Sequence, residues 1–123
     1  MVRVSSERFE ELVRDAMEGL PDQFLSRIDN VVVVVQQRPT RAQMDHHGLG
    51  PNETLFGLYE GVPMTVRGSY APSMPDRITI FQGPMERYCD TEEQLVEQVR
   101  KTVVHEVAHY FGIDDDRLDE LGL

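Results

Sequence analysis

The feature that most constrains the fold of this chain is an uninterrupted amphipathic stretch between Asp90 and Phe111. The stretch contains neither proline nor glycine, and Thr91 and Gln94 have the spacing of a capping box. On a helical wheel, one arc of about 140° gathers most of its apolar side chains. These are Val96, Val99, Val103, Val104, Val107, Tyr110 and Phe111. The stretch therefore predicts a helix that packs one face against a core.

The opposite face of this predicted helix carries two histidines four residues apart, His105 and His109. Residues at this spacing project the same way, one turn above the other, so both imidazoles can bind one metal ion. A core histidine would more often share the apolar arc, and these two do not. Glu106 follows the first histidine and can hold a metal-bound water. The pattern therefore predicts a metal site with Glu106 as its catalytic base.

The end of the helix suggests a third metal ligand. Gly112 suits the left-handed position that terminates many helices. A chain that turns there can return a carboxylate to the metal at Asp115. Asp116 and Asp119 are competing candidates, because zinc accepts any well-placed carboxylate. Two nitrogens and one oxygen would leave the fourth zinc position for water, as in a catalytic site.

The pattern H-E-x-x-H-x-x-G-x-x-D, which ends at Asp115, is similar to that of the zincin metallopeptidases. It has aspartate in the third-ligand position of the metzincin consensus, although no methionine turn follows. With the valine run at 31–35 and the segments at 58–63 and 116–118, the sequence resembles the bacterial mini-zincins, which are minimal zincin-like metallopeptidase domains.

The resemblance implies a minimal zincin-like α+β fold and one Zn²⁺ ion held by His105, His109 and Asp115. It also implies that the protein is an enzyme, a metallopeptidase. Peptide bonds would be hydrolysed by a zinc-bound water that Glu106 activates.

The remaining sequence fits a single domain over residues 1–123, with a small three-stranded sheet packed on helices. Apolar spacing and capping residues predict helices at about 6–20 and 21–28, and a short closing helix at 117–121. Strands are expected at 31–36, 54–60 and 77–81. The first strand consists mostly of β-branched residues, which predicts burial on both faces. The third alternates between apolar and polar residues, which predicts a half-buried strand. Polar or Gly-, Ser- and Pro-rich residues predict loops at 40–54 and 68–76.

Residues 55–60, within the strand expected at 54–60, are the candidate for holding an extended peptide, because Gly57 and the flanking loops suit a sheet edge better than the valine run does. Backbone pairing along such an edge makes Leu55, Gly57 and Tyr59 the predicted substrate-binding residues. Tyr59, Tyr88 and Arg77 are all candidates for stabilising the oxyanion, and the sequence does not choose among them. The expected partner is therefore a peptide or protein substrate.

The net charge and the cysteine content limit which binding partners and which cellular compartment are expected. Twelve Lys and Arg against 22 Asp and Glu give a net charge of −10. This charge argues against nucleic acid and against an anionic membrane surface, which both attract basic patches. A single cysteine, Cys89, suits a reducing compartment, and no segment resembles a signal peptide or a membrane span. The expected location is the bacterial cytoplasm.

Two other functions would use the same residues. In a zinc-stabilised module that binds peptides or proteins without cleaving them, Glu106 would be idle. A structural zinc normally has four protein ligands, so a fourth ligand from His46 or His47 would favour this alternative. Metal-dependent hydrolysis of a small molecule is the third interpretation of the motif.

Overall fold

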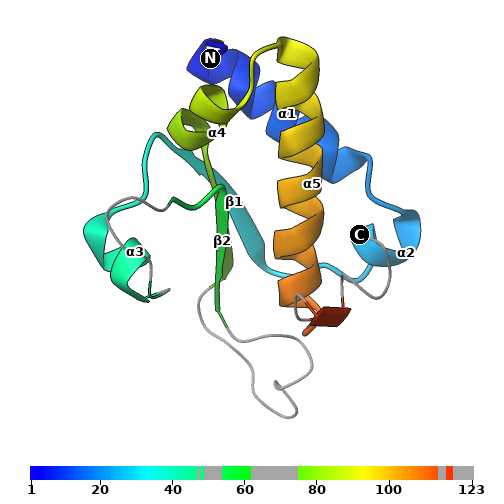
Figure 1. Ribbon diagram of the computed structural model, residues 1–123. Coiled ribbons are helices and arrows are strands. Elements are labelled where there is room, and N and C mark those ends of the chain that lie inside the picture. The colour runs from blue at the N-terminus through cyan, green and yellow to red at the C-terminus, as the bar shows by residue number, and fades with distance from the viewer. Residues whose placement is uncertain (47, 49–53, 62–74, 114–115, 118–123) are drawn as a thin grey trace.

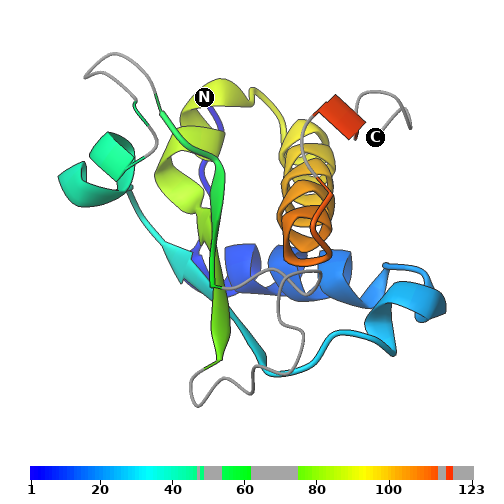
Figure 2. The same cartoon turned by 90° about the horizontal axis from the view of Figure 1, so that it is seen from below.

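The computed structural model describes residues 1–46, 48, 54–61, 75–113 and 116–117 of the chain. Their elements follow the order α1 (Ser6–Glu18), α2 (Asp22–Leu25), β1 (Val31–Gln36), α3 (Arg41–His46), β2 (Gly57–Glu60), β3 (Asp76–Phe81), α4 (Gln82–Tyr88) and α5 (Glu92–Tyr110). Helix α5 contacts α1, β2 and β3, and Figures 1 and 2 show the sheet beside these two helices. The predicted α+β fold, with a small sheet packed on helices that include α5, is confirmed.

The sheet has the strand order β1-β3-β2 in the described residues. β1 runs parallel to β3 and β2 runs antiparallel to it, so that Ile78 pairs with Val33 on one side and Tyr59 on the other. The central strand β3 is buried except at Arg77, so the prediction that this strand is half-buried was wrong. β1 is an edge strand with Val32 41% exposed, so the prediction of burial on both faces was also wrong. Among the described residues, β1 pairs in parallel with β3 on one side only. β-branched residues such as valine favour strands whether or not the strand is fully buried, so the valine run does not require burial on both faces.

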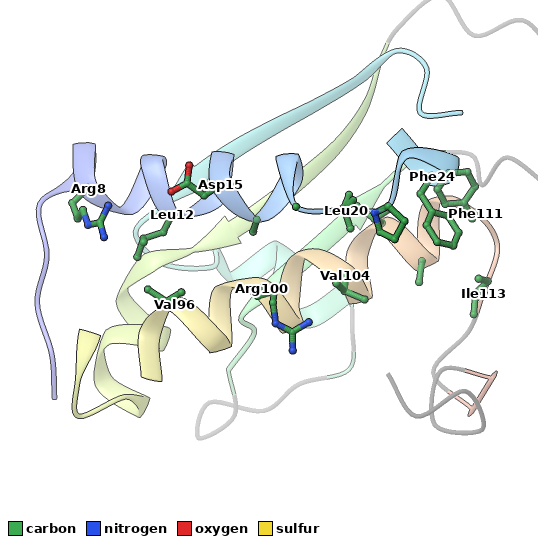
Figure 3. Close-up of a pocket in the computed structure, with 15 residues that line it drawn as sticks. Arg8, Leu12, Asp15, Leu20, Phe24, Val96, Arg100, Val104, Phe111 and Ile113 are labelled. Carbon is green, nitrogen blue, oxygen red and sulfur yellow. The ribbon is translucent and has the colours of Figure 1, made fainter. Parts of the chain in front are cut away.

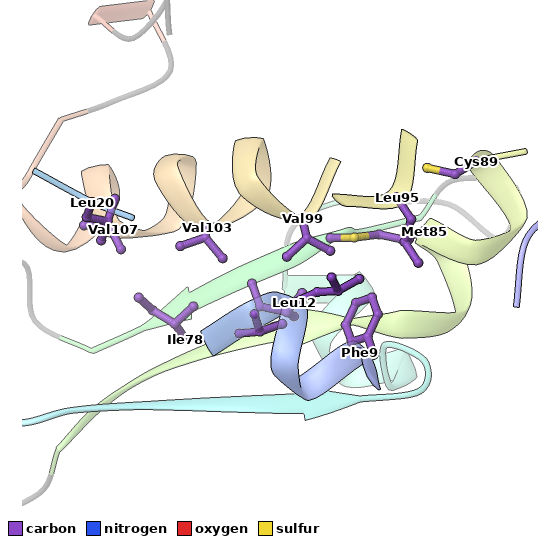
Figure 4. Packing of buried hydrophobic residues seen from close by; sticks show 12 residues of the cluster. Phe9, Leu12, Leu20, Ile78, Met85, Cys89, Leu95, Val99, Val103 and Val107 are labelled. Carbon is purple, nitrogen blue, oxygen red and sulfur yellow. The ribbon is translucent and has the colours of Figure 1, made fainter. Parts of the chain in front are cut away.

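The hydrophobic core lies between one face of the sheet and helices α1, α4 and α5. Figure 4 shows its side chains converging from these elements. The buried cluster comprises Phe9, Leu12, Val13, Leu20, Ile78, Ile80, Met85, Cys89, Leu95, Val99, Val103 and Val107. Burial of a large apolar side chain contributes about 1.5–3 kcal/mol, so this cluster is the main source of stability for the fold.

Of the helices outside α5, α1 and α3 begin at side-chain caps, whereas α2 and α4 have no side-chain cap hydrogen bond. Two of these helices, α3 and α4, were not predicted. Ser5 caps α1 by accepting a hydrogen bond from the backbone N of Arg8 at 3.0 Å. α2 is shorter than the predicted helix at 21–28. α3 lies in the expected loop at 40–54 and begins after Thr40, whose Oγ1 accepts from the N of Gln43 at 3.1 Å. α4 was missed because its first turn holds glycine and proline, and proline is tolerated there.

Two other predicted segments reach beyond the described residues. Of the closing helix at 117–121, only Arg117 is described, and it is helical together with Asp116. The expected loop at 68–76 falls mostly outside the described part, and its last residue, Asp76, begins β3. No helix in the described ranges combines the length and the apolar character needed to cross a membrane.

Candidate metal site

Helix α5 begins at the predicted cap. Thr91 Oγ1 accepts a hydrogen bond from the backbone N of Gln94 at 3.1 Å. The side chain of Gln94 returns to the backbone N of Asp90, at 2.7 Å, and not to that of Thr91. The capping box therefore closes one residue earlier than its usual form. These two bonds fix the start of the helix that carries the motif.

The same helix ends at Gly112 in a Schellman motif. Gly112 has a φ of 80°, a left-handed conformation that favours glycine. Its N donates to the carbonyl of His109, and the N of Ile113 donates to that of Ala108, both at 2.9 Å. The predicted helix terminator is confirmed. The helix therefore ends at Tyr110, and the left-handed turn at Gly112 comes three residues after the second histidine of the motif.

His105 and His109 are half-buried on α5, and Glu106 between them is buried, with 7% of its surface exposed. Nδ1 of His109 lies 3.3 Å from Oε1 of Glu106. A carboxylate only accepts, so Nδ1 is the donor in this contact when it carries the ring proton. A neutral ring protonated at Nδ1 has its lone pair on Nε2, which is one of the two forms in which an imidazole can bind a metal.

Strand β2 covers the face of α5 that carries Glu106. A Cβ atom at Gly57 would lie 2.6 Å from Cγ2 of Thr102 and 3.1 Å from Cγ of Glu106. Thr102 is therefore buried, although the helical wheel groups it with the histidines on the polar side. Its Oγ1 donates to the carbonyl of Gln98 at 2.8 Å. A glycine within a predicted strand is the one sequence signal for so close an approach of strand and helix.

The predicted substrate-binding residues lie on or next to β2, which is the last strand of the sheet in the described part of the chain. Leu55 is half-buried just before the strand. The hydroxyl of Tyr59 donates to Oδ2 of Asp76 at 2.6 Å, and its ring lies edge-on to Tyr110 with 6.1 Å between centroids. The strand thus turns Gly57 and Tyr59 toward successive turns of α5.

The other two oxyanion candidates lie elsewhere. Tyr88 ends α4, is 70% exposed, and packs its ring 5.3 Å from that of Phe56. Arg77 is exposed and alternates with the buried Ile78, so its side chain lies on the face of the sheet away from the core. Neither residue is positioned by a described contact with the histidines of α5.

The two imidazoles, four residues apart on one helix, are donors of a type that zinc accepts, and a zinc site would need at least one further ligand. Asp115 and Asp119 lie outside the described residues, as does His47. Within the described ranges, no three His, Cys, Asp or Glu side chains come close enough to hold a metal ion. His46, on α3, is therefore not grouped with the histidine pair.

Cys89 is not a candidate ligand. It is buried at the end of α4, before α5 begins, whereas the histidines lie near the end of α5. Burial is the largest cause that raises the pKa of the Cys89 thiol, and the neighbouring Asp90 carboxylate raises it further. A thiol whose pKa is raised stays protonated at neutral pH and is a poor metal ligand.

An apolar groove between α1 and α5 is separate from the histidine pair (Figure 3). Its lining includes Leu12, Leu20, Phe24, Val96, Val104, Ala108, Phe111 and Ile113, with Arg8, Asp15 and Arg100 among the charged residues. Val104 and Ala108 line it, and neither His105 nor His109 does. The groove is therefore not the candidate metal site.

Comparisons with known proteins bear on the fold and on the family of the chain. A solved structure of a conserved hypothetical protein from the bacterium Thermus thermophilus matches with a TM-score of 0.56 and 20% sequence identity, over 96% of this chain and 97% of that chain. At this identity, the likeness shows the fold alone. No curated protein matches the sequence. A family model described as zincin-like metallopeptidase matches residues 28–123, which include the whole helix α5 and the residues after it. The chain therefore belongs to the zincin-like metallopeptidase family.

Proposed function

We propose that this protein is a zinc-dependent peptidase, with Glu106 as its catalytic base and His105, His109 and Asp115 as its metal ligands. The observation that carries the proposal is the placement of Glu106, whose buried carboxylate lies between the ring of His109 and the edge strand β2. Family membership supports the reaction class, and the spacing of the histidines on α5 supports the ligand pair.

Zinc, when bound, polarises a carbonyl group and lowers the pKa of water. The chain supplies the proton transfer. Glu106 would take a proton from the attacking water on its carboxylate and later deliver it to the leaving amine. Its Oε1 faces His109, whereas Oε2 lies 3.4 Å from the position that a Cβ atom of Gly57 would take. The carboxylate is thus held beside the strand along which a substrate would run.

The substrate we propose is an extended segment of a peptide or protein. The outer edge of β2 has no strand partner among the described residues, because β2 ends the sheet. An extended peptide can add to such an edge through backbone hydrogen bonds. A strand added there would lie next to Leu55, Gly57 and Tyr59. The net charge of −10 would disfavour strongly acidic substrates.

The alternative function, a zinc-stabilised binding module, needs a fourth protein ligand. His46 does not join the histidine pair of α5 in the described part of the chain, so it gives this alternative no support. Hydrolysis of a small molecule would use the same zinc and the same base. A digest of peptides distinguishes it from peptidase action.

The test is to incubate the zinc-loaded protein with a diverse peptide mixture and to identify cleaved bonds by mass spectrometry. Glu106→Gln and the chelator-treated protein are the matched controls. Cleavage by the native protein that disappears in both controls would support the peptidase. Intact peptides in the presence of stoichiometric zinc would reject it in favour of the module or the small-molecule hydrolase.

A further inference from the structure

Strand β2 approaches helix α5 so closely at position 57 that any side chain there would have to displace a neighbouring atom. Gly57 is a strand residue without the positive φ of Gly48, Gly61 and Gly112. Its backbone conformation is therefore open to any L-residue, and the available space alone requires glycine. A Cβ atom there would come within 2.6 Å of Thr102 Cγ2, a distance that real Cβ contacts essentially never show.

The second neighbour of this position is Glu106. The same Cβ atom would lie 3.1 Å from Cγ and 3.4 Å from Oε2 of Glu106. The Oε1 atom of Glu106 is in turn 3.3 Å from Nδ1 of His109. The buried carboxylate is thus bounded by the strand backbone on one side and by an imidazole on the other, and it has little room to move away from an added methyl group.

We propose that Gly57 is a positioning residue: the absence of a side chain at this point of β2 fixes where the carboxylate of Glu106 lies. The expected effect on catalysis rests on the proposed peptidase function. The claim that Gly57 fixes the position of the Glu106 carboxylate rests on geometry alone. A misplacement of about 1 Å at a reacting group can cost about 100-fold in rate. A side chain at position 57 should therefore lower kcat while zinc content and KM change little.

Gly57→Ala alone would not test the proposal, because the contact with Thr102 could unfold the protein or separate β2 from α5. Thr102→Ser removes Cγ2, the atom that a new methyl group would meet first. It keeps the hydroxyl that donates to the carbonyl of Gln98. The informative protein is the double variant G57A/T102S, with Thr102→Ser as its matched control.

We expect Thr102→Ser to turn over peptide as the native protein does. The double variant should keep the melting temperature and zinc content of Thr102→Ser but lose about 10-fold to 100-fold in kcat, with KM within about twofold. A second readout does not depend on activity. The side-chain ¹³Cδ resonance of Glu106, assigned through its loss in Glu106→Gln, should shift in the double variant and stay in place in Thr102→Ser.

The two proposals can fail separately. A native protein without peptidase activity would reject the function, while a shifted Glu106 resonance in the double variant would still support the positioning role. A folded double variant with an unshifted resonance would overturn it, whatever its activity. So would a kcat loss that follows only from lost zinc or lost stability, because that result would make Gly57 merely structural.

Discussion

Nδ1 of His109 lies 3.3 Å from Oε1 of Glu106, so the proposed base contacts a proposed metal ligand within one turn of α5. The contact is through Nδ1 of the ring. In the proposed site Nε2 would be the metal-binding atom, and a carboxylate contact to the other ring nitrogen orients the imidazole in many metal sites. The same short spacing that defines the motif in the sequence therefore couples the position of the base to that of the ligand.

Glu106→Gln should retain zinc and lose hydrolysis. Glutamine keeps an oxygen that can accept from His109, but its amide cannot take a proton at neutral pH. We expect turnover to fall by about 100-fold to 10,000-fold, the usual contribution of a general base. Steady-state kinetics and elemental analysis measure the two effects. Glu97→Gln, on the exposed face where Glu97 pairs with Arg100, is the control. Undiminished turnover would remove Glu106 as the base.

His109→Ala should abolish stoichiometric zinc binding. The loss should exceed the roughly 10-fold to 100-fold weakening that is typical when an outer-shell partner of a metal is removed, because a ligand itself is lost. Isothermal titration with zinc measures the affinity. His46→Ala is the matched control, since His46 lies on α3 outside the histidine pair. Equal zinc affinity in the two variants would contradict the ligand pair on α5.

Asp115→Ala tests the third ligand. Removing a carboxylate ligand should weaken zinc affinity at least about 10-fold and leave the fold of the described core intact. Asp116→Ala and Asp119→Ala serve as comparisons, because the sequence makes both carboxylates alternative candidates for the third zinc ligand. The variant with the largest loss of affinity in a competition assay with a chelating dye identifies the ligand. An unaffected Asp115→Ala would assign the position to a neighbour.

Local signals made α5 predictable from sequence. Three features were predicted: the cap at Thr91, the terminator at Gly112 and the spacing of the two histidines. Each of them depends on a few neighbouring residues, no more than about four positions apart. The position of β2 at the end of the sheet, as far as the described residues show it, also agrees with the expectation from Gly57 and the flanking loops. These features depend on capping, helical periodicity and glycine chemistry, which act over short stretches of chain.

The errors arose where distant segments decide the outcome. The valines of β1 and the alternating pattern of β3 do not reveal that β3 is central and β1 lies at the edge, because sheet order is a tertiary property. The wheel of α5 grouped Thr102 with the polar face, yet β2 covers that residue. Val96 falls within the apolar arc but is 44% exposed, because it lines the groove between α1 and α5.

Gly112→Ala should destabilise the protein by about 1–2 kcal/mol, because a left-handed conformation brings a Cβ atom close to the following carbonyl oxygen. Gly19→Ala is the matched control at the end of α1. Gly19 has a φ of −78°, which alanine adopts readily, so a change within about 0.5 kcal/mol is expected there. Urea unfolding followed by circular dichroism measures both. Equal costs in the two variants would mean that the left-handed turn is not what terminates α5.

Tyr110→Phe should lower the free energy of unfolding by about 1–3 kcal/mol, because it removes the hydroxyl at the end of α5 that binds the backbone of Asp29. The hydroxyl of Tyr110 accepts from the N of Asp29 and donates to the carbonyl of Asp29, both at 3.1 Å. Tyr110 is 1% exposed, so phenylalanine would leave both backbone groups without this partner in a part-buried setting.

Tyr88→Phe is the control, because Tyr88 is exposed and should lose almost nothing. Chemical denaturation gives both free energies of unfolding, and hydrogen exchange at Asp29 reports the anchor directly. We expect faster exchange at Asp29 in Tyr110→Phe alone. Native exchange and native stability in that variant would show that the segment between α2 and β1 is held to α5 by packing and not by the tyrosine hydroxyl.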